Sequence, residues 1–353
     1  MKKFGFVIFI LIAITFTNSC SKHYSLFHSK AKWMKDYFAE IKSGNYPNIY
    51  AISWWNEDWQ NEDESYTYLR IQSSNRSQKK YKELISDDLF ITKCSFSGKL
   101  IPVEGSIYHG AFPDFSGPED VVTKERIDIF EEAAGKEIAW AYFSNNWMDS
   151  LIFPENHINI ITSAGKTPFI RLMFRSVFEE NTADPVYKLT DIINGRYDSA
   201  IVAWARAAKA TGVNLLAEFG TEVNGEWFPW NGTYYGGGTL DNYGDPTYPD
   251  GPEIFRDAYR HFIDLCNSQN ADNITWFFHL DDSVIPEEWW NEPSYYYPGD
   301  NYIDWIGIST YGPFQRGDEY IKPTELLQKA YKMMENVSTT KPYAILEFGI
   351  TEL

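Results

Sequence analysis

From residue 106 onward, short apolar stretches with strand character alternate with amphipathic stretches of helical spacing. This alternation favours parallel strands joined by crossover helices, the pattern of an α/β barrel. Seven strands are expected, at 106–112, 138–143, 168–174, 214–220, 274–280, 304–310 and 342–347. Because the usual (β/α)8 barrel closes with eight strands, one more has to come from elsewhere in the chain.

The front of the chain offers that strand. Residues 29–44 carry Trp33, Tyr37 and Phe38 at helical spacing, and residues 49–55 form an apolar stretch that ends on two tryptophans. A second helix is expected at 78–87. We therefore predict that residues 20–353 form a single (β/α)8 barrel domain, because a barrel of this kind typically takes about 250 residues.

The first twenty residues resemble a bacterial export signal. Two lysines precede an apolar run at 4–16, which is too short to span a bilayer comfortably, so residues 1–19 are predicted to be a cleaved signal peptide. Ser19 before Cys20 resembles a lipoprotein cleavage box, although Thr17 stands where the box usually has Leu. We expect an outer-membrane or cell-surface lipoprotein anchored through Cys20, or otherwise a periplasmic or secreted protein.

The composition of the chain narrows the classes of molecule that it is expected to bind. The chain of 353 residues has 31 basic and 49 acidic side chains and a net charge of −18, which repels nucleic acid and anionic lipid and favours a neutral polymer. Aromatic residues make up 17%, with 13 Trp, more than a core needs, so some should line a groove. Cys94 and Cys266 fit neither a metal-site spacing nor a disulfide framework. We expect a monomer without metal or cofactor.

Two glutamates stand at the ends of apolar strands. The stretch 215–232 runs from a strand into Thr221 and Glu222 and then into aromatic residues, and the stretch 341–349 ends in Glu347. Aromatic faces stack on sugar rings, and a pair of carboxylates is the minimum equipment for glycoside hydrolysis. Either glutamate alone could equally be a solvated loop residue or one half of an ion pair.

Three stretches, FGTEVNGEWFPWNG, YYYPGDNYIDWIGISTYG and KPYAILEFG, resemble glycoside hydrolase family 26. The resemblance covers roughly residues 106–353 and implies a retaining (β/α)8 glycosidase with its acid/base after strand four and its nucleophile after strand seven. Counted from residue 106, Glu222 follows the fourth strand and Glu347 the seventh. Thr221 departs from the family, which usually has His there.

In the family, a helix, an eighth strand ending in Trp and a final helix follow the nucleophile strand. Residues 29–90 resemble that tail, although they stand before the first strand. We therefore predict a circularly permuted barrel in which residues 29–90 supply the seventh helix, the eighth strand and the eighth helix. The alternative is a truncated gene or a clipped tandem of two enzymes.

The resemblance implies an endo-acting retaining β-glycanase, with β-1,4-mannan as the first choice of substrate and mixed-linked β-glucan or xylan as alternatives. Glu347 would be the nucleophile, Glu222 the acid/base, and Tyr311 a donor to the nucleophile. The expected sugar contacts are Trp54, Trp55, Trp227, Trp230, His279, Asn224 and Arg171, besides Tyr311. A rival from another class is a surface glycan-binding lipoprotein without turnover.

Overall fold

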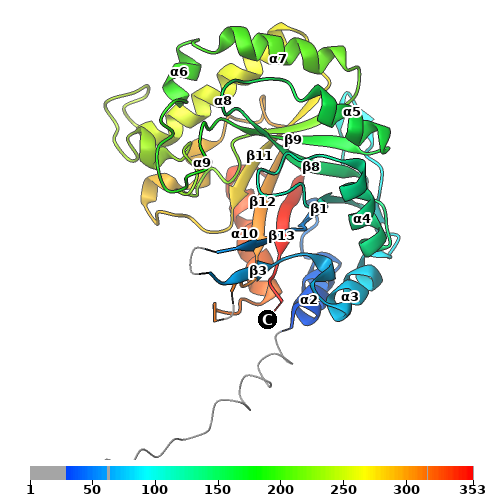
Figure 1. Ribbon diagram of the computed structural model, residues 1–353. Helices are drawn as coiled ribbons and strands as arrows, with labels where there is room; N and C mark the ends of the chain where they lie inside the picture. Colours follow the sequence, from blue (N-terminus) through cyan, green and yellow to red (C-terminus); the bar gives the residue numbers. More distant parts are fainter. Residues whose placement is uncertain (1–28, 62–63, 316, 353) are drawn as a thin grey trace, which may run out of the picture.

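The computed structural model in Figure 1 describes residues 29–61, 64–315 and 317–352. Its main sheet has nine strands, all paired in parallel; eight of them close into a barrel and the short β4 attaches beside β7. The barrel strands, in spatial order, are β1 (Ile49–Trp55), β7 (Ile107–Phe112), β8 (Trp140–Asn146), β9 (Thr167–Met173), β10 (Leu215–Phe219), β11 (Ile274–Asp281), β12 (Trp305–Tyr311) and β13 (Tyr343–Gly349). The predicted (β/α)8 class is therefore confirmed.

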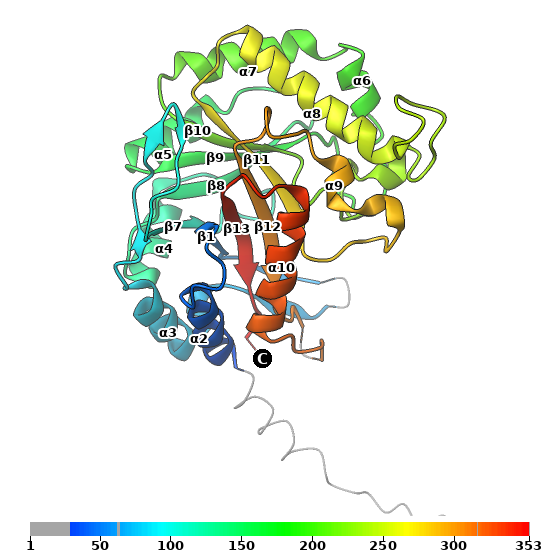
Figure 2. The same cartoon turned by 180° about the vertical axis from the view of Figure 1, so that it is seen from behind.

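Strand β1 closes the barrel between the first and last strands of the later part of the chain. Ile52 pairs with Ile345 of β13 on one side and with His109 of β7 on the other. Figure 2 shows β1, β13 and β12 side by side. The eighth strand thus comes from the front of the chain, as predicted. The circular permutation relative to the family stays a prediction.

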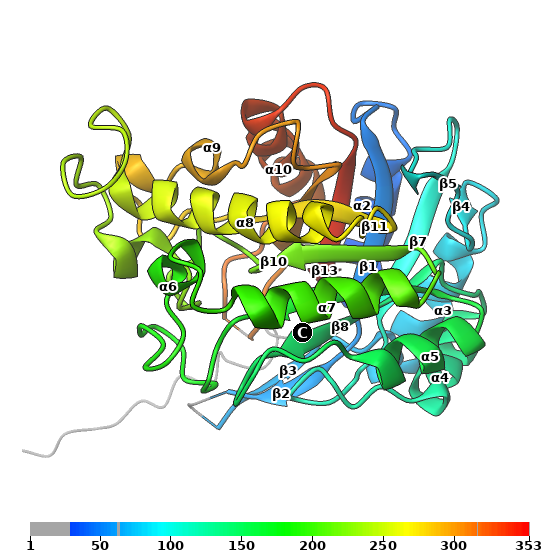
Figure 3. The ribbon, with the colours of Figure 1, turned by 90° about the horizontal axis from the view of Figure 1, so that it is seen from above.

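Helices surround the barrel, as the view from above shows (Figure 3). They are α2 (Lys30–Ile41), α3 (Asn75–Ile85), α4 (Lys124–Ala134), α5 (Glu155–Ser163), α6 (Leu189–Ile193), α7 (Asp198–Ala210), α8 (Asp250–Ser268), α9 (Pro293–Tyr296) and α10 (Pro323–Val337). Their ends follow the sequence: the Thr123 side chain caps α4 by accepting from the Arg126 N–H, and Gly135 ends it at φ 66°. Pro323 occupies the first turn of α10.

The loops between the barrel elements contain short strands and 3-10 turns. They are the strands β2 (Asp58–Gln60), β3 (Tyr66–Tyr68), β4 (Phe90–Ile91), β5 (Phe96–Ser97) and β6 (Lys99–Leu100), and the 3-10 turns η1 (Ile71–Ser73), η2 (Gly232–Tyr235) and η3 (Trp289–Asn291). The β2–β3 hairpin follows β1 directly and stands beside the mouth of the barrel, where it contributes Trp59 to a cavity.

The front segment packs tightly on the strand that carries Glu347. The Tyr37 ring stacks on Phe348 at 4.9 Å, and its hydroxyl lies 2.6 Å from Thr310 Oγ1. The two ends of the described chain also meet. Ser73 Oγ accepts from Lys30 Nζ and donates to Glu352, both at 3.0 Å. Residues 29–90 are therefore part of the barrel's own core.

The export predictions fall outside the described residues. Residues 1–19 and Cys20 are not described, so the signal peptide and the lipid anchor stay predictions. In the part of the chain that is described, no helix has both the length and the hydropathy to cross a bilayer. Cys94 and Cys266 are both free thiols.

Candidate active site

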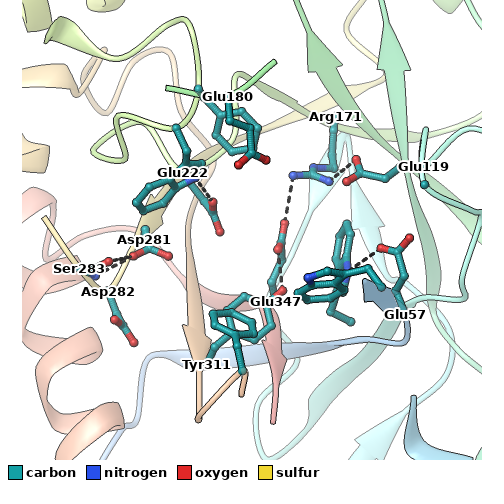
Figure 4. A pocket seen from close by; sticks show the side chains of 16 residues that line it. Glu57, Glu119, Arg171, Glu180, Glu222, Asp281, Asp282, Ser283, Tyr311 and Glu347 are labelled. Carbon is teal, nitrogen blue, oxygen red and sulfur yellow. Dashed lines mark hydrogen bonds and ion pairs between the residues drawn. The ribbon is translucent and has the colours of Figure 1, made fainter. Parts of the chain in front are cut away.

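A cavity of about 610 Å³ opens where the carboxyl ends of the barrel strands meet their loops, the usual place for a site in this fold. Figure 4 shows Glu222 and Glu347 pointing into it from opposite sides. Its lining comprises Trp55, Glu57, Trp59, Gly117, Glu119, Arg171, Glu180, Glu222, Trp227, Phe228, Asp281, Asp282, Ser283, Tyr311, Phe314 and Glu347. Carboxylates and aromatic rings therefore dominate its wall.

Glu347 projects from β13, near its end, into the floor of the cavity. Tyr311, at the end of the neighbouring strand β12, donates its hydroxyl to Oε2 at 2.8 Å, and Arg171 Nη2 lies 3.4 Å from Oε1. The residue is 4% exposed. Burial raises the pKa of Glu347 to about 7, while the Arg171 guanidinium opposes this shift and the Glu222 carboxylate adds to it. Oε1 is left as an acceptor without a well-formed hydrogen bond among the described residues.

Glu222 lies three residues beyond the end of β10 in a turn. Its backbone has φ 48°, a left-handed conformation that residues other than glycine rarely adopt. The turn is closed by a hydrogen bond from the Gly225 N–H to the Glu222 carbonyl at 2.9 Å. Trp227 Nε1 donates to Glu222 Oε2 at 2.8 Å and so orients the carboxylate. Strained backbone of this kind is common at functional sites.

The two carboxylates are close. One oxygen of Glu222, one oxygen of Glu347 and a ring nitrogen of His279 all lie within 4.8 Å of one another. Glycosidases that retain configuration place the two carboxyl groups about 5–5.5 Å apart, whereas inverting enzymes leave about 6.5–9.5 Å for a water. The distance between the two carboxylate oxygens is nearer to the retaining value than to the inverting one.

Arg171 crosses the floor of the cavity from β9 and neutralises several acids at once. Its guanidinium bonds Glu119 at 2.6 Å, lies 3.5 Å from Glu218, and packs 4.9 Å from the centre of the Trp55 ring. Burial lowers the pKa of Arg171, but the surrounding carboxylates, Glu119 first, outweigh burial and hold it well above its usual value. The positive charge therefore persists beside Glu347 at every relevant pH.

Comparison with known proteins finds a matching family and several relatives. The sequence profile described as Glycosyl hydrolase family 26 matches residues 178–343. This match covers slightly less than half of the chain. Among curated proteins it is 26% identical over 236 residues to Endoglucanase H of Acetivibrio thermocellus, covering 65% of this chain and 23% of that protein.

A second curated relative is Mannan endo-1,4-beta-mannosidase A and B of Caldalkalibacillus mannanilyticus, 28% identical over 142 residues, 40% of this chain and 23% of that protein. The match thus spans less than a quarter of the length of either relative. Similar solved structures include a ruminal GH26 endo-beta-1,4-mannanase (TM-score 0.45, 14% identity, 77% of this chain and 57% of that one). A mannanase of Bacillus subtilis has a TM-score of 0.39 with 16% identity, over 63% of this chain and 74% of that one.

Most of the predicted site residues meet in the cavity. Glu222 and Glu347 face each other, and Trp55, Trp227, Tyr311 and Arg171 line the wall around them. Their contacts with sugar stay predictions, but their positions agree with the expectation. Tyr311 donates to Glu347 as expected.

Two tryptophans do not reach the cavity, and the prediction that they bind sugar is wrong. Trp54 is fully buried on the opposite face of β1 from Trp55, because successive residues of a strand alternate in direction. Its Nε1 donates to the Leu69 carbonyl at 3.0 Å. Trp230 is also fully buried, and its Nε1 donates to the Thr221 carbonyl at 2.7 Å.

Asn224 and His279 are also misassigned as sugar contacts. Asn224 is buried and ties two loops together, with its amide nitrogen on the carbonyls of Asp281 and Ser283 and its amide oxygen on the Asp281 N–H. His279 is 1% exposed, and both of its ring nitrogens face protein groups. Both residues therefore stabilise the structure around the cavity without lining it.

The predicted site residues leave out several acids in the wall of the cavity and beneath it. Glu57 and Glu119 come from irregular loops after β1 and β7, where no periodic pattern marks them. Burial, reinforced by the Glu119 carboxylate, raises the pKa of Glu57 to about 8. Burial likewise raises the pKa of Asp282 to about 6. A detectable signal did exist for Glu218, since a glutamate inside an otherwise apolar strand needs a buried partner.

Glu222, His279 and Glu347 are close enough together to be considered as metal ligands. His279, however, has Nε2 at 2.9 Å from Ser309 Oγ and Nδ1 at 2.9 Å from Glu218 Oε2. A metal at this position would have to break one of these hydrogen bonds. The arrangement fits two acids working on a sugar better than a metal centre.

Proposed function

We propose that this chain is an endo-acting retaining β-glycanase that hydrolyses β-1,4-mannan. The observation that carries the proposal is the pair Glu222 and Glu347, whose carboxylates face each other within 4.8 Å in an open cavity. The names of the two curated relatives, an endoglucanase and a mannan endo-1,4-β-mannosidase, support endo-acting cleavage of a β-linked polysaccharide.

In the first step Glu347 attacks the anomeric carbon while Glu222 gives its proton to the leaving glycosidic oxygen. The C–O bond to the leaving sugar breaks, and a glycosyl ester forms on Glu347. The Tyr311 hydroxyl and the Arg171 guanidinium stabilise the Glu347 carboxylate before attack. Glu222, now ionised, then takes a proton from water, whose oxygen displaces Glu347 and restores the starting configuration.

The wall supports a neutral substrate. Besides the two central glutamates, Glu57, Glu119 and Asp281 line the cavity, and its arginine is already paired with Glu119. The negative charge of a uronate-bearing chain would find no unpaired cation among these lining residues. Trp227, which is half-buried in the wall, offers an apolar ring surface to uncharged sugar rings.

A second candidate substrate is mixed-linked β-glucan. The specific observation in its favour is that Endoglucanase H matches 65% of this chain, against 40% for the mannosidase. Reducing-sugar release from mannan, mixed-linked β-glucan and xylan separates the candidates. The rival function, glycan binding without turnover, predicts binding to one polymer with no release from any.

Substitution of the two glutamates tests the mechanism. We expect Glu222→Gln to lower turnover of polymer about 10²–10⁴-fold, as loss of a general acid does. Glu347→Gln should cost on the order of 10⁴-fold or more, as loss of a covalent nucleophile does. Azide should revive Glu347→Ala on an activated aryl glycoside and give the inverted glycosyl azide. Near wild-type activity in either Gln variant would refute the assignment.

We further propose export and lipidation at Cys20, followed by anchoring at the outer membrane or cell surface. The support is the leader composition and the Ser19–Cys20 box. The wild type should partition with membranes, and Cys20→Ser should appear in the soluble periplasmic or secreted fraction. Wild-type protein that is soluble after export would leave a plain cleaved signal peptide.

A further inference from the structure

A buried pair of charged side chains lies directly beneath the two central glutamates. Glu218, inside β10, and His279, inside β11, are almost completely buried. His279 Nδ1 lies 2.9 Å from Glu218 Oε2, and the Tyr142 hydroxyl donates to Glu218 Oε1 at 2.5 Å. The mechanism above uses neither member of the pair.

His279 contacts the residues on both sides of Glu222. Its Nδ1 lies 2.8 Å from Thr221 Oγ1, and its backbone carbonyl accepts from the Val223 N–H at 3.2 Å. Glu222, between these two residues, has the left-handed φ of 48°. A backbone conformation of this kind persists only where the surroundings enforce it. One residue of β11 therefore fixes both flanks of the strained turn.

The pair is itself anchored to the other side of the site. His279 Nε2 lies 2.9 Å from Ser309 Oγ of β12, two residues before Tyr311, the donor to Glu347. His279 is thus joined to the Glu222 turn through one ring nitrogen and, through the other, to the strand that orients Glu347.

Electrostatics favour an ionised pair. Burial lowers the pKa of His279, but the Glu218 carboxylate and its hydrogen bond outweigh burial and raise the pKa above its usual value. Burial raises the pKa of Glu218, and the same histidine outweighs that effect and lowers it. The imidazolium also faces Glu222 and Glu347, while the Tyr142, Thr221 and Ser309 hydroxyls and the Arg171 guanidinium complete the surroundings of the pair.

Packing alone does not explain such a pair. Replacing a buried ion pair by well-packed apolar residues is often neutral or stabilising, so stability does not require charges at these two positions. What an apolar pair could not supply is the directed contact with Thr221 and the fixed distance between the Glu222 turn and β12. The pair fits a role in geometry.

We propose that Glu218 and His279 act as positioning residues that hold the Glu222 turn in its left-handed conformation and aim the Glu222 carboxyl at the leaving oxygen. This inference rests on the proposed glycosidase function. It assigns the pair to proton transfer rather than to nucleophilic attack, and the two steps can be separated by choice of substrate.

Thr221 provides the mildest test, because Thr221→Val keeps the shape and removes only the hydroxyl that faces His279. We expect kcat on polymer to fall about 10–100-fold with little change in KM, as for a misplaced catalytic group. A dinitrophenyl glycoside of the matching disaccharide needs no proton for departure, so its kcat/KM should fall less than about threefold. Thr221→Ser restores a hydroxyl and should recover about tenfold of the rate lost on polymer.

Glu218→Gln should show the same split between substrates, because it removes the charge that orients the imidazole. Azide should speed turnover of the activated glycoside by both Thr221→Val and Glu218→Gln, since azide needs no base, and should give the retained glycosyl azide.

The matched control is His109→Gln. His109 is another fully buried barrel histidine, on β7, bonded to the Tyr81 hydroxyl at 3.0 Å and to the Glu137 carbonyl at 2.9 Å, and it does not line the cavity. We expect His109→Gln to leave the ratio of activity on polymer to activity on the activated glycoside at its wild-type value.

Equal losses on polymer and on the activated glycoside, or a Thr221→Val variant no different from His109→Gln, would overturn the proposal. Both results presuppose an active wild type. A wild type that cleaves no polymer at all refutes the glycosidase function instead, so the two failures are distinguishable.

Discussion

Glu347 and Glu222 enter the same cavity from two differently built regions. Glu347 belongs to a regular strand, and β13 is paired along its length with β1 on one side and β12 on the other. Glu222 lies outside any strand, in a turn beyond β10, and its backbone has a positive φ. One acid is placed by the sheet, whereas the other is placed by a loop.

The supports of the two acids differ accordingly. Around Glu347 they are the Tyr311 hydroxyl, from the adjacent strand β12, and the Arg171 guanidinium, from β9 across the barrel. Around Glu222 they are side-chain contacts within and beneath the turn, from Trp227 and His279. The nucleophile's position thus depends on barrel closure and charge balance, and the acid/base's position depends on a few directed hydrogen bonds.

The largest expected effect comes from opening the barrel beside Glu347. Deleting residues 29–90 removes β1 and leaves the facing edges of β13 and β7 unpaired. It also exposes Phe348, which Tyr37 and Trp54 cover. We expect no soluble protein in an expression assay. A variant that begins at residue 29 is the control and should stay soluble, and a soluble, cooperatively unfolding fragment 91–353 would contradict the prediction.

The next effect concerns the charge on Glu347 and the free energy of unfolding. Its folded pKa of about 7 lies above the usual 4.5, so the stability it contributes is complete below pH 4.5 and is lost as pH rises through 7. The shift corresponds to about 3 kcal/mol. Glu347→Gln should therefore gain about that much relative to wild type between pH 4.5 and 8, measured by urea unfolding.

Glu132→Gln, on the exposed face of α4, serves as the control for this titration and should follow the wild-type pH dependence. A pH-independent difference between wild type and Glu347→Gln would show that the environment of Glu347 does not disfavour its charge.

A smaller effect, on the pH dependence of kcat/KM, distinguishes the hydrogen bond that supports Glu347 from the one that supports Glu222. On an activated glycoside, which needs no acid, kcat/KM should fall about tenfold per pH unit below about 7, as Glu347 becomes protonated. Tyr311→Phe removes a hydrogen bond that favours the ionised form, so this limb should move up by about one pH unit. Trp227→Phe removes the corresponding bond to Glu222 and should leave the limb in place. Equal shifts of this limb in both variants would show that Glu347 and Glu222 are not supported independently.

The sequence predicted what regular secondary structure determines. The strand count from residue 106, the need for a closing strand and the positions of Glu222 and Glu347 all follow from periodicity, and the structure agrees. It could not choose between Trp54 and Trp55, because a slip of one residue reverses the faces of a strand.

Loop conformation is the second feature of the site that could not be predicted from the sequence. Whether Trp230 or Trp227 reaches the cavity depends on how the residues after β10 turn, and Glu119 enters from a loop with no pattern. The role of His279 was misjudged for a related reason: a polar residue near a strand end was expected to face the sugar, yet its partner Glu218 lies deep inside the barrel.

The smallest effect tests the comparison at the backbone itself. At Glu222, with φ 48°, glycine should be more stable than alanine by about 1 kcal/mol, because only glycine adopts the left-handed region without steric cost. At Glu347, in the extended strand β13, the order should reverse, with alanine better by about 0.5–1 kcal/mol. Both members of each pair lack the carboxylate, so lost hydrogen bonds cancel and only the backbone preference remains. Urea unfolding of the four variants Glu222→Gly, Glu222→Ala, Glu347→Gly and Glu347→Ala measures both differences. The same sign at both positions would show that the turn carries no strain and that the two acids are held alike.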